Sequence, residues 1–121
     1  MSKFFKILLG MVASIGLLIG LTGCASQSVD MAKVTSVIDV RTAGEYAQGH
    51  LQGAVNIDVE ANDFSDRVAQ LDKAGTYLVY CHSGRRAGIA TDNMHAMGFT
   101  DVTNIGGIND AASTTKLSIV Q

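Results

Sequence analysis

The 121-residue sequence contains no proline and no tryptophan, and its only cysteines are Cys24 and Cys81. Average proline usage would give about six prolines, so Pro-rich linkers and stalks are excluded. Two cysteines cannot supply a disulfide scaffold or a four-cysteine zinc site. Basic residues are also few: without Lys3 and Lys6, seven Lys and Arg face eleven Asp and Glu. Such an acidic domain is a poor candidate for nucleic-acid binding, which needs clustered cations.

A run without charge from Ile7 to Gly23 follows Lys3 and Lys6. A positive start and a short apolar core are typical of a secretory signal peptide, and the run is short for a transmembrane span of about 20 residues. Its end, Leu21-Thr22-Gly23-Cys24, resembles the bacterial lipobox. The resemblance implies cleavage before Cys24 and attachment of lipid to the Cys24 thiol.

We therefore expect three parts: a lipoprotein signal peptide at 1–23, a lipidated cysteine with a polar tether at 24–33, and one domain at 34–121. An uncleaved anchor helix is the alternative reading of the first part. Both readings predict an exported, membrane-anchored domain, on the periplasmic side, because the basic end stays in the cytoplasm. Ala25 follows the cysteine where an acidic residue would suggest retention at the inner membrane, which weakly favours the outer membrane of a Gram-negative cell.

Short β-rich runs alternate with helical patterns in the rest of the chain. Strands are expected at 37–40, 54–57, 77–80 and 101–105. Helices are expected at 61–71, with Phe64, Val68 and Leu71 on one face, and at 84–97, with Ile89, Ala90, Met94 and Met97 on one face and Gly98 as a stop signal. This order predicts an α/β fold whose central sheet is mainly parallel and flanked by helices on both faces. In such folds the functional site lies at the carboxyl ends of the strands.

Cys81 follows the apolar run 77–80 and begins the link Cys81-His82-Ser83-Gly84-Arg85-Arg86 to the next helix. Backbone N–H groups at a helix start lack partners within the helix and can hold negative charge. A thiol at the rim of such a cradle is expected to lose its proton easily. A buried and inert cysteine is the alternative. Because an exported cysteine without an internal partner is a candidate reactive thiol, the first interpretation is favoured.

A series of motifs in this order resembles a single-domain rhodanese, a thiosulfate sulfurtransferase-like family. The motifs are Val37-Ile-Asp-Val-Arg41, Glu45-Tyr46, Gly49-His50, Gly53-Ala54-Val55-Asn56-Ile57, Tyr80-Cys81-His82-Ser83-Gly84-Arg85-Arg86, Gly98-Phe99 and Gly106-Gly107. The resemblance spans about residues 34–112. It implies the rhodanese-like fold and transfer of sulfane sulfur through a persulfide on Cys81, with no cofactor. No metal site is expected, because His50, His82 and His95 do not make ligand spacing with one cysteine.

The length of the cysteine loop separates this chemistry from phosphate chemistry. Four residues lie between Cys81 and Arg86, whereas a tyrosine-phosphatase-like CX5R loop would need an arginine at position 87, which is Ala87. A small ring of N–H donors suits one sulfur atom better than a tetrahedral phosphate. We expect the Cys81 thiolate to attack thiosulfate or a polysulfide, and backbone N–H groups of about His82 to Arg86 to hold the persulfide. Cyanide, another thiol or a protein partner then accepts the sulfur.

Four side chains of the loop complete the expected substrate-binding site. Arg86 is expected to tie the loop by donating to carbonyls or to a carboxylate, with contact to the anionic donor as the alternative. Arg85 is expected to face solvent and substrate. His82 either tunes the thiolate or fills the rim, and Ser83 lies between His82 and Gly84.

Residues on other segments are expected to support the loop. Asp39 and Arg41 end the first strand at the same edge of the sheet as Cys81, and Asp39 is expected to brace the loop or to cap the strand. The resemblance implies a structural role for Glu45 and His50, at the turn before Gly53.

The chain also departs from the rhodanese pattern. Gln52 stands where proline is usual, and Ile108 follows Gly106-Gly107 where an aromatic residue is usual. The smaller wall at Ile108 leaves the substrate preference open. Two functions remain: a sulfurtransferase, and a carrier or sensing module that holds sulfur at the membrane without turnover. The intact Cys81 and its two arginines favour the enzyme.

Overall fold

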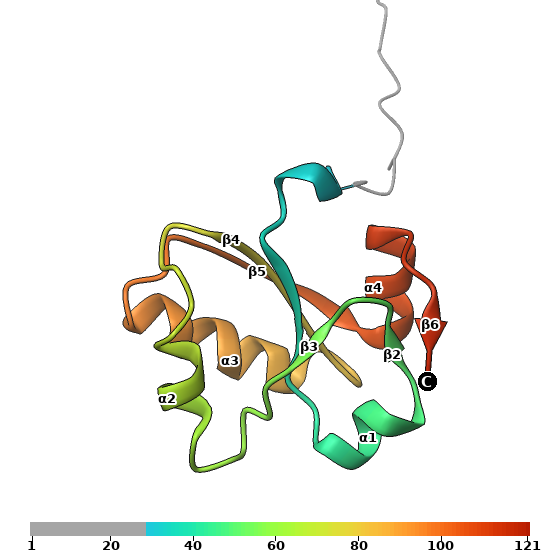
Figure 1. Ribbon diagram of the computed structural model, residues 1–121, viewed down its shortest axis with the longest axis horizontal. Coiled ribbons are helices and arrows are strands. Elements are labelled where there is room, and N and C mark those ends of the chain that lie inside the picture. Colours follow the sequence, from blue (N-terminus) through green and yellow to red (C-terminus); the bar gives the residue numbers. More distant parts are fainter. Residues whose placement is uncertain (1–28) are drawn as a thin grey trace, which may run out of the picture.

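The computed structural model describes residues 29–121 (Figure 1). Its main sheet is parallel, in the order β3-β1-β4-β5, and consists of β1 (Ser36–Asp39), β3 (Val55–Asn56), β4 (Thr76–Cys81) and β5 (Asp101–Gly107). A small antiparallel pair joins β2 (His50–Leu51) to β6 (Ile119–Val120). The helices are η1 (Met31–Lys33), α1 (Ala43–Gln48), α2 (Phe64–Val68), α3 (Arg85–Ala96) and α4 (Ile108–Thr115). The predicted α/β architecture is confirmed.

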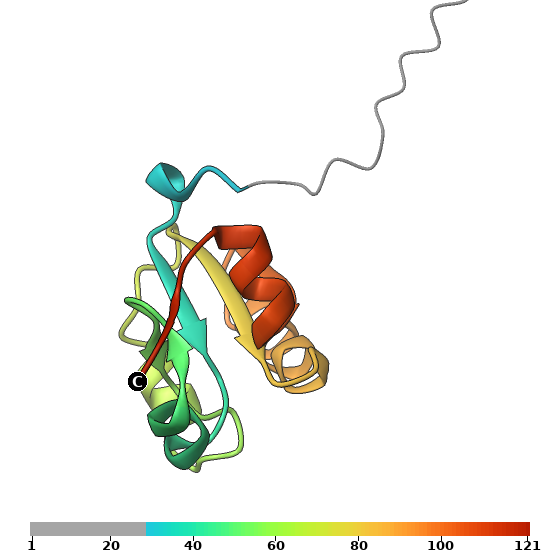
Figure 2. The same cartoon turned by 90° about the vertical axis from the view of Figure 1, so that its right-hand side faces the viewer.

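Strand β4 lies in the middle of the molecule and is buried on both faces (Figure 2). Successive side chains of a strand point to opposite faces of the sheet. Val79 and Cys81 therefore pack with residues of α2 and α3, whereas Leu78 and Tyr80 pack with residues of β2 and α4. The continuous apolar run predicted this double burial, and the structure confirms it.

Helix α3 follows the expected periodicity with one exception. Ala90 and Met94 are buried against the sheet, as expected, but Ile89 is 44% exposed. The buried stripe of α3 runs through Ala87, Ala90 and Met94, and Ile89 lies outside this stripe because each helical residue is rotated by about 100° from the last. The helix ends before Gly98, whose φ of +103° is the left-handed conformation that glycine adopts most easily.

Several elements were missing from the expected set. Helix α1 begins with a capping box in which Thr42 and Glu45 bond each other's backbone N–H groups, a signal that the sequence contains. Helix α4 consists largely of small polar residues, which give no clear periodicity. The C-terminal residues continue α4 to Thr115 and then pair with β2 through β6.

The expected signal peptide, Cys24 and most of the tether lie outside the described residues. The end of the expected tether forms η1, and Val29 and Met31 pack against the core cluster on the α4 face of the sheet. Within residues 29–121, no helix has the length and apolar character needed to cross a membrane.

Candidate active site

The carboxyl ends of β1, β4 and β5 bring three segments of the sequence together. Cys81 is the last residue of β4, and its backbone is in register with Gly107 at the end of β5. On the other side, Asp39 at the end of β1 is in register with Tyr80. The site therefore lies at the edge of the sheet that the parallel topology predicts. Cys81 itself is fully buried.

The chain turns sharply after Cys81 and enters α3 at Arg85. Gly84 caps the helix with a φ of +97°, which a residue with a side chain adopts only with strain. In this conformation the Gly84 N–H donates a hydrogen bond to the Cys81 Sγ over 2.9 Å. The turn thus directs a backbone donor at the thiol. N–H groups of about His82 to Arg86 were expected to hold the sulfur, and within this segment the Gly84 N–H alone makes a hydrogen bond to Sγ.

The cysteine loop packs backbone to backbone against the end of β5. A Cβ atom added to Gly84 would lie 3.3 Å from the Gly106 Cα, and a Cβ atom added to Gly107 would overlap the His82 carbonyl oxygen. Side chains do not fit between the two segments. The Gly106-Gly107 pair therefore acts as the surface on which the loop rests, directly before α4.

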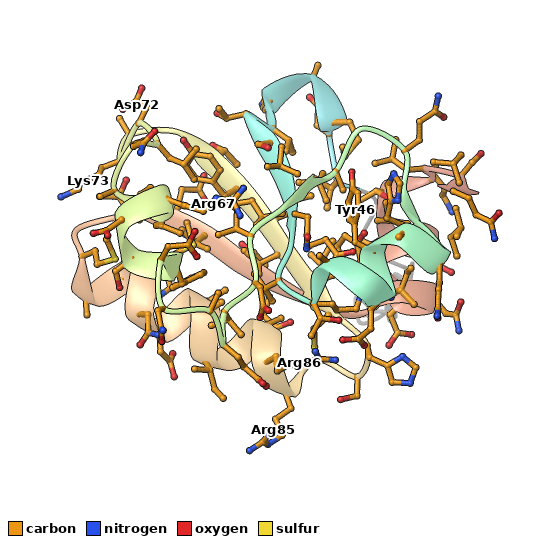
Figure 3. All side chains as sticks on the ribbon, turned by 60° about the horizontal axis from the view of Figure 1, so that its bottom comes forward. Tyr46, Arg67, Asp72, Lys73, Arg85 and Arg86 are labelled. Atoms are coloured by element: carbon orange, nitrogen blue, oxygen red, sulfur yellow. The ribbon has the colours of Figure 1, made fainter. Side chains whose placement is uncertain are left out.

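Arg86 ties the start of α3 to α1. Its guanidinium donates to the two Glu45 carboxylate oxygens over 2.7 and 3.0 Å, and Figure 3 shows Arg86 directed toward α1. The hydrogen bonds from Arg86 lower the pKa of Glu45 to about 2; bonds from Thr42 act in the same direction and partial burial acts against them. The same pairing raises the pKa of Arg86. Arg86 was expected to donate to carbonyls or to a carboxylate, and in the structure its partner is a carboxylate.

Asp39 and Arg41 form a second, buried ion pair. Arg41 donates to Asp39 over 2.7 Å and to the Gly49 carbonyl over 2.6 Å, and the Asp39 hydrogen bond raises the Arg41 pKa. The expected brace from Asp39 to the cysteine loop is absent from the hydrogen bonds of the described residues. The Asp39 carboxylate is turned to Arg41 instead, so the pair fixes the segment between β1 and β2, and Glu45 provides the brace to α3.

The remaining loop side chains reach solvent. His82, Ser83 and Arg85 are exposed, and Arg85 points away from the protein body (Figure 3). His50 stacks on Tyr46 with ring centroids 3.7 Å apart and bonds the Tyr46 carbonyl. This stacking anchors the turn after α1, the region in which the resemblance implied a structural role for His50.

A pocket of about 400 Å³ opens beside the loop, on the α1 and α4 side. It is lined by Arg41, Glu45, Gln48, Gly49, His82, Ile108 and Ile119. Ile108 is the residue that replaces the usual aromatic, and its position on the pocket wall agrees with the expected link to substrate preference. Sequence reasoning missed Gln48 and Ile119. The capping box of Thr42 and Glu45 could have located the helix that carries Gln48, whereas Ile119 lies on a two-residue strand with a weak signal.

Groups of His, Cys, Asp and Glu that could hold a metal ion do not occur within residues 29–121. The structure brings together at this edge a thiol beside a helix start, two paired arginines and an exposed arginine.

Residues 24–113 match the family model of the rhodanese-like domain. The thiosulfate sulfurtransferase PspE of Escherichia coli (strain K12) is 43% identical over 77 residues, which cover 62% of this chain and 72% of that protein. A solved structure described as "rhodanese with anions from E. coli" superposes with a TM-score of 0.60 at 37% identity, over 71% of this chain and 96% of that one. A Bacillus subtilis (strain 168) protein named "Putative sulfur carrier protein YrkF" is 32% identical over 91 residues, which cover 74% of this chain and 48% of that protein.

These matches, together with the parallel sheet and the cysteine loop at its carboxyl edge, show that the chain belongs to the rhodanese-like domain family. The family predicted from the motifs is confirmed.

Proposed function

We propose that this chain is a sulfurtransferase that moves sulfane sulfur from thiosulfate or a polysulfide to a thiophilic acceptor through a persulfide on Cys81. The family and the thiosulfate sulfurtransferase relatives support sulfur transfer in general. The finer proposal is carried by the hydrogen bond from the Gly84 N–H to the Cys81 Sγ. Such a donor stabilises the thiolate more than the thiol, and the thiolate is the nucleophile.

In the first half-reaction the Cys81 thiolate attacks the outer sulfur of thiosulfate. A bond forms between Sγ and that sulfur, the S–S bond of thiosulfate breaks, and sulfite leaves with the bonding electron pair. The persulfide keeps one negative charge beside the N–H groups at the start of α3. Because Cys81 is fully buried, side chains at the rim move aside when the donor enters.

In the second half-reaction the acceptor attacks the outer sulfur of the persulfide. Cyanide leaves as thiocyanate, or an acceptor thiolate leaves as a persulfide, and the electron pair of the broken S–S bond returns to Cys81 as thiolate. The pocket beside His82 has about 400 Å³ of space, and small organic ligands occupy pockets of about 300–1,000 Å³. This size is consistent with a thiol that carries an organic group, seated between Ile108 and Ile119.

Arg85 supplies the positive charge for the anionic donor. Arg86 is neutralised by Glu45, whereas the Arg85 side chain is exposed and directed into solvent (Figure 3). An exposed cation near the loop raises the local concentration of an anion, and salt screens that effect. Thiosulfate turnover should therefore weaken as ionic strength rises.

A sulfur carrier without useful turnover is the second candidate. The full burial of Cys81 favours it, since a persulfide closed off from water is protected from loss of its sulfur. The Bacillus subtilis relative has a sulfur-carrier name and adds support. In a carrier, one sulfur atom loads per chain and cyanide removes it slowly; in an enzyme, many cycles follow at a constant rate.

The experiment is thiocyanate production from thiosulfate and cyanide by the full-length chain in detergent, with Cys81→Ala and Cys24→Ser variants. The proposal expects turnover in wild type and in Cys24→Ser, and none in Cys81→Ala. One thiocyanate per chain, without further cycles, would favour the carrier. A folded, reduced wild type that forms no thiocyanate would overturn the thiosulfate reaction.

We also propose that the domain is exported and anchored to a membrane by lipid on Cys24, and that a protein at the membrane is a further acceptor of its sulfur. The basis is the lipobox-like Leu21-Thr22-Gly23-Cys24 and the apolar run before it. Metabolic labelling with a fatty acid tests this: label should enter the wild type and Cys81→Ser, and should be lost in Cys24→Ser. Equal labelling of wild type and Cys24→Ser would contradict the anchor.

A further inference from the structure

Asn104, on β5, connects the end of that strand to the cysteine loop. Its Nδ2 donates a hydrogen bond to the Gly84 carbonyl over 3.0 Å, and its Oδ1 accepts one from the Gly106 N–H over 2.8 Å. The side chain therefore bonds the residue that caps α3 and a residue of the glycine pair under the loop. Nothing in the sequence motifs singled out this position.

Gly84 is the residue on which these contacts converge. Its N–H donates to the Cys81 Sγ over 2.9 Å, while its carbonyl accepts from Asn104 and from the Gly88 N–H. One residue thus carries the donor to sulfur on one side and the tie to β5 on the other. The N–H and the carbonyl belong to one residue, whose φ is +97°. A shift of the carbonyl therefore also redirects the N–H.

Side-chain packing cannot hold Gly84 in place. Glycine has no side chain, and a Cβ atom at this position would lie only 3.3 Å from the Gly106 Cα. The orientation of the Gly84 peptide groups therefore depends on backbone packing against Gly106 and on hydrogen bonds. The Gly88 bond is an ordinary first bond of α3 and fixes the helix; the Asn104 bond fixes the cap relative to β5.

An amide side chain suits this position because it offers a donor and an acceptor on one group. Aspartate would keep the acceptor for Gly106 but lose the donor to Gly84, and alanine would lose both. Asn104 is itself exposed, so its removal takes little from the core. The loss should fall on the geometry of the loop and much less on the fold.

We propose that Asn104 is a positioning residue for sulfur transfer: it holds the Gly84 N–H in line with the Cys81 sulfur and so stabilises the thiolate. This inference rests on the proposed function of Cys81 as the sulfur nucleophile. Asn104 touches neither sulfur nor substrate, and it acts through Gly84.

The test is the pH profile of thiolate formation, followed by ultraviolet absorbance of the full-length protein. The spectrum of the matching Cys81→Ala protein is subtracted, which removes Cys24 and the tyrosines. Asn104→Ala should move the profile to higher pH by about one unit, and kcat/KM at neutral pH should fall about tenfold, as expected when a hydrogen bond to a charged group is weakened. Asn104→Asp should shift the profile at least as far, because its charge also opposes the thiolate.

Asn93→Ala is the matched control, since Asn93 is an exposed asparagine in the later part of α3. It should leave both the profile and kcat/KM unchanged. The melting temperatures of Asn104→Ala and Asn93→Ala should be similar. A pH profile of Asn104→Ala that coincides with that of wild type overturns the proposal, and so does a wild type in which Cys81 gives no titration.

The absorbance readout needs no turnover, so it separates this inference from the proposed function. A wild type that forms a thiolate but no thiocyanate would overturn the thiosulfate reaction while the Asn104 comparison still decides the positioning role.

Discussion

Two arginine–carboxylate pairs at the carboxyl edge of the sheet have similar geometry and different surroundings. In both, an arginine nitrogen lies 2.7 Å from a carboxylate oxygen. The Arg41 and Asp39 side chains are 6% and 0% exposed, whereas those of Arg86 and Glu45 are 18% and 33% exposed. The buried pair of Arg41 and Asp39, the inner pair, joins residues two apart in sequence. The pair of Arg86 and Glu45, the outer pair, joins residues 41 apart.

The difference in burial decides what each pair does. Removal of one partner from a buried pair leaves an uncompensated charge, which costs far more than the pair contributes as a whole. Water and salt screen the attraction between exposed charges, so removal of one partner from an exposed pair costs little stability. The inner pair is therefore a condition for folding of the segment between β1 and β2, and the outer pair is an adjustable tie between the cysteine loop and α1.

The largest effect is expected when the inner pair is broken. Asp39→Ala leaves Arg41 buried without its counter-charge and should lower the free energy of unfolding by about 3–5 kcal/mol. Urea denaturation measures this change. Asp92→Ala removes an exposed aspartate of α3 and should change stability by less than about 0.5 kcal/mol. Equal stability of the two variants would mean that the inner pair does not hold the fold.

A smaller effect is expected at the outer pair. Glu45→Gln removes the charge that faces Arg86 and should cost about 0.5–1 kcal/mol of stability, with a loss of less than about tenfold in the sulfur-transfer rate. Urea denaturation and thiocyanate production measure the two changes. Glu60→Gln is the control, because Glu60 acts on Arg86 through charge alone and should have a weaker effect. A loss as large as that of Asp39→Ala would erase the distinction between the pairs.

The smallest effect is the pH dependence of the outer pair. The pKa of Glu45 is lowered from 4.5 to about 2, so its contribution is complete above pH 4.5 and disappears as the pH falls through 2. The stability difference between wild type and Glu45→Gln should thus be constant above this window and shrink within it. Denaturation curves at several pH values measure the difference. A gap that widens as the pH falls would contradict the assignment.

The sequence predicted the parts of this molecule that depend on strong local patterns. Buried strand residues such as Val79, the stripe Ala90–Met94 on α3, the Gly98 stop and the loop from Cys81 to Arg86 all appear where periodicity and residue type placed them. The same patterns predicted the family. These predictions agree with the structure because one chemical requirement, either burial or a left-handed turn, determines each feature.

What the sequence did not predict depends on contacts between distant segments. Glu45 meets Arg86 across 41 residues, and Asn104 meets Gly84 across 20; no local pattern encodes either contact. Asp39 is a different case, because its contact is local: it sits at the expected edge, but the guanidinium two residues away takes its carboxylate. Helix α4 is stabilised by packing that its small polar residues do not reveal. Strand β6 is only two residues long and forms by pairing with β2.

If Cys81 carries the transferred sulfur, intact-protein mass spectrometry should detect that sulfur on the protein. The reduced full-length protein is incubated with thiosulfate, freed of excess reagent and measured before and after addition of cyanide. Wild type and Cys24→Ser should gain the mass of one sulfur atom and lose it to cyanide, while Cys81→Ala should gain nothing. A mass gain of one sulfur atom in Cys81→Ala would contradict sulfur transfer through Cys81. So would the absence of this gain in a folded wild type supplied with either thiosulfate or polysulfide.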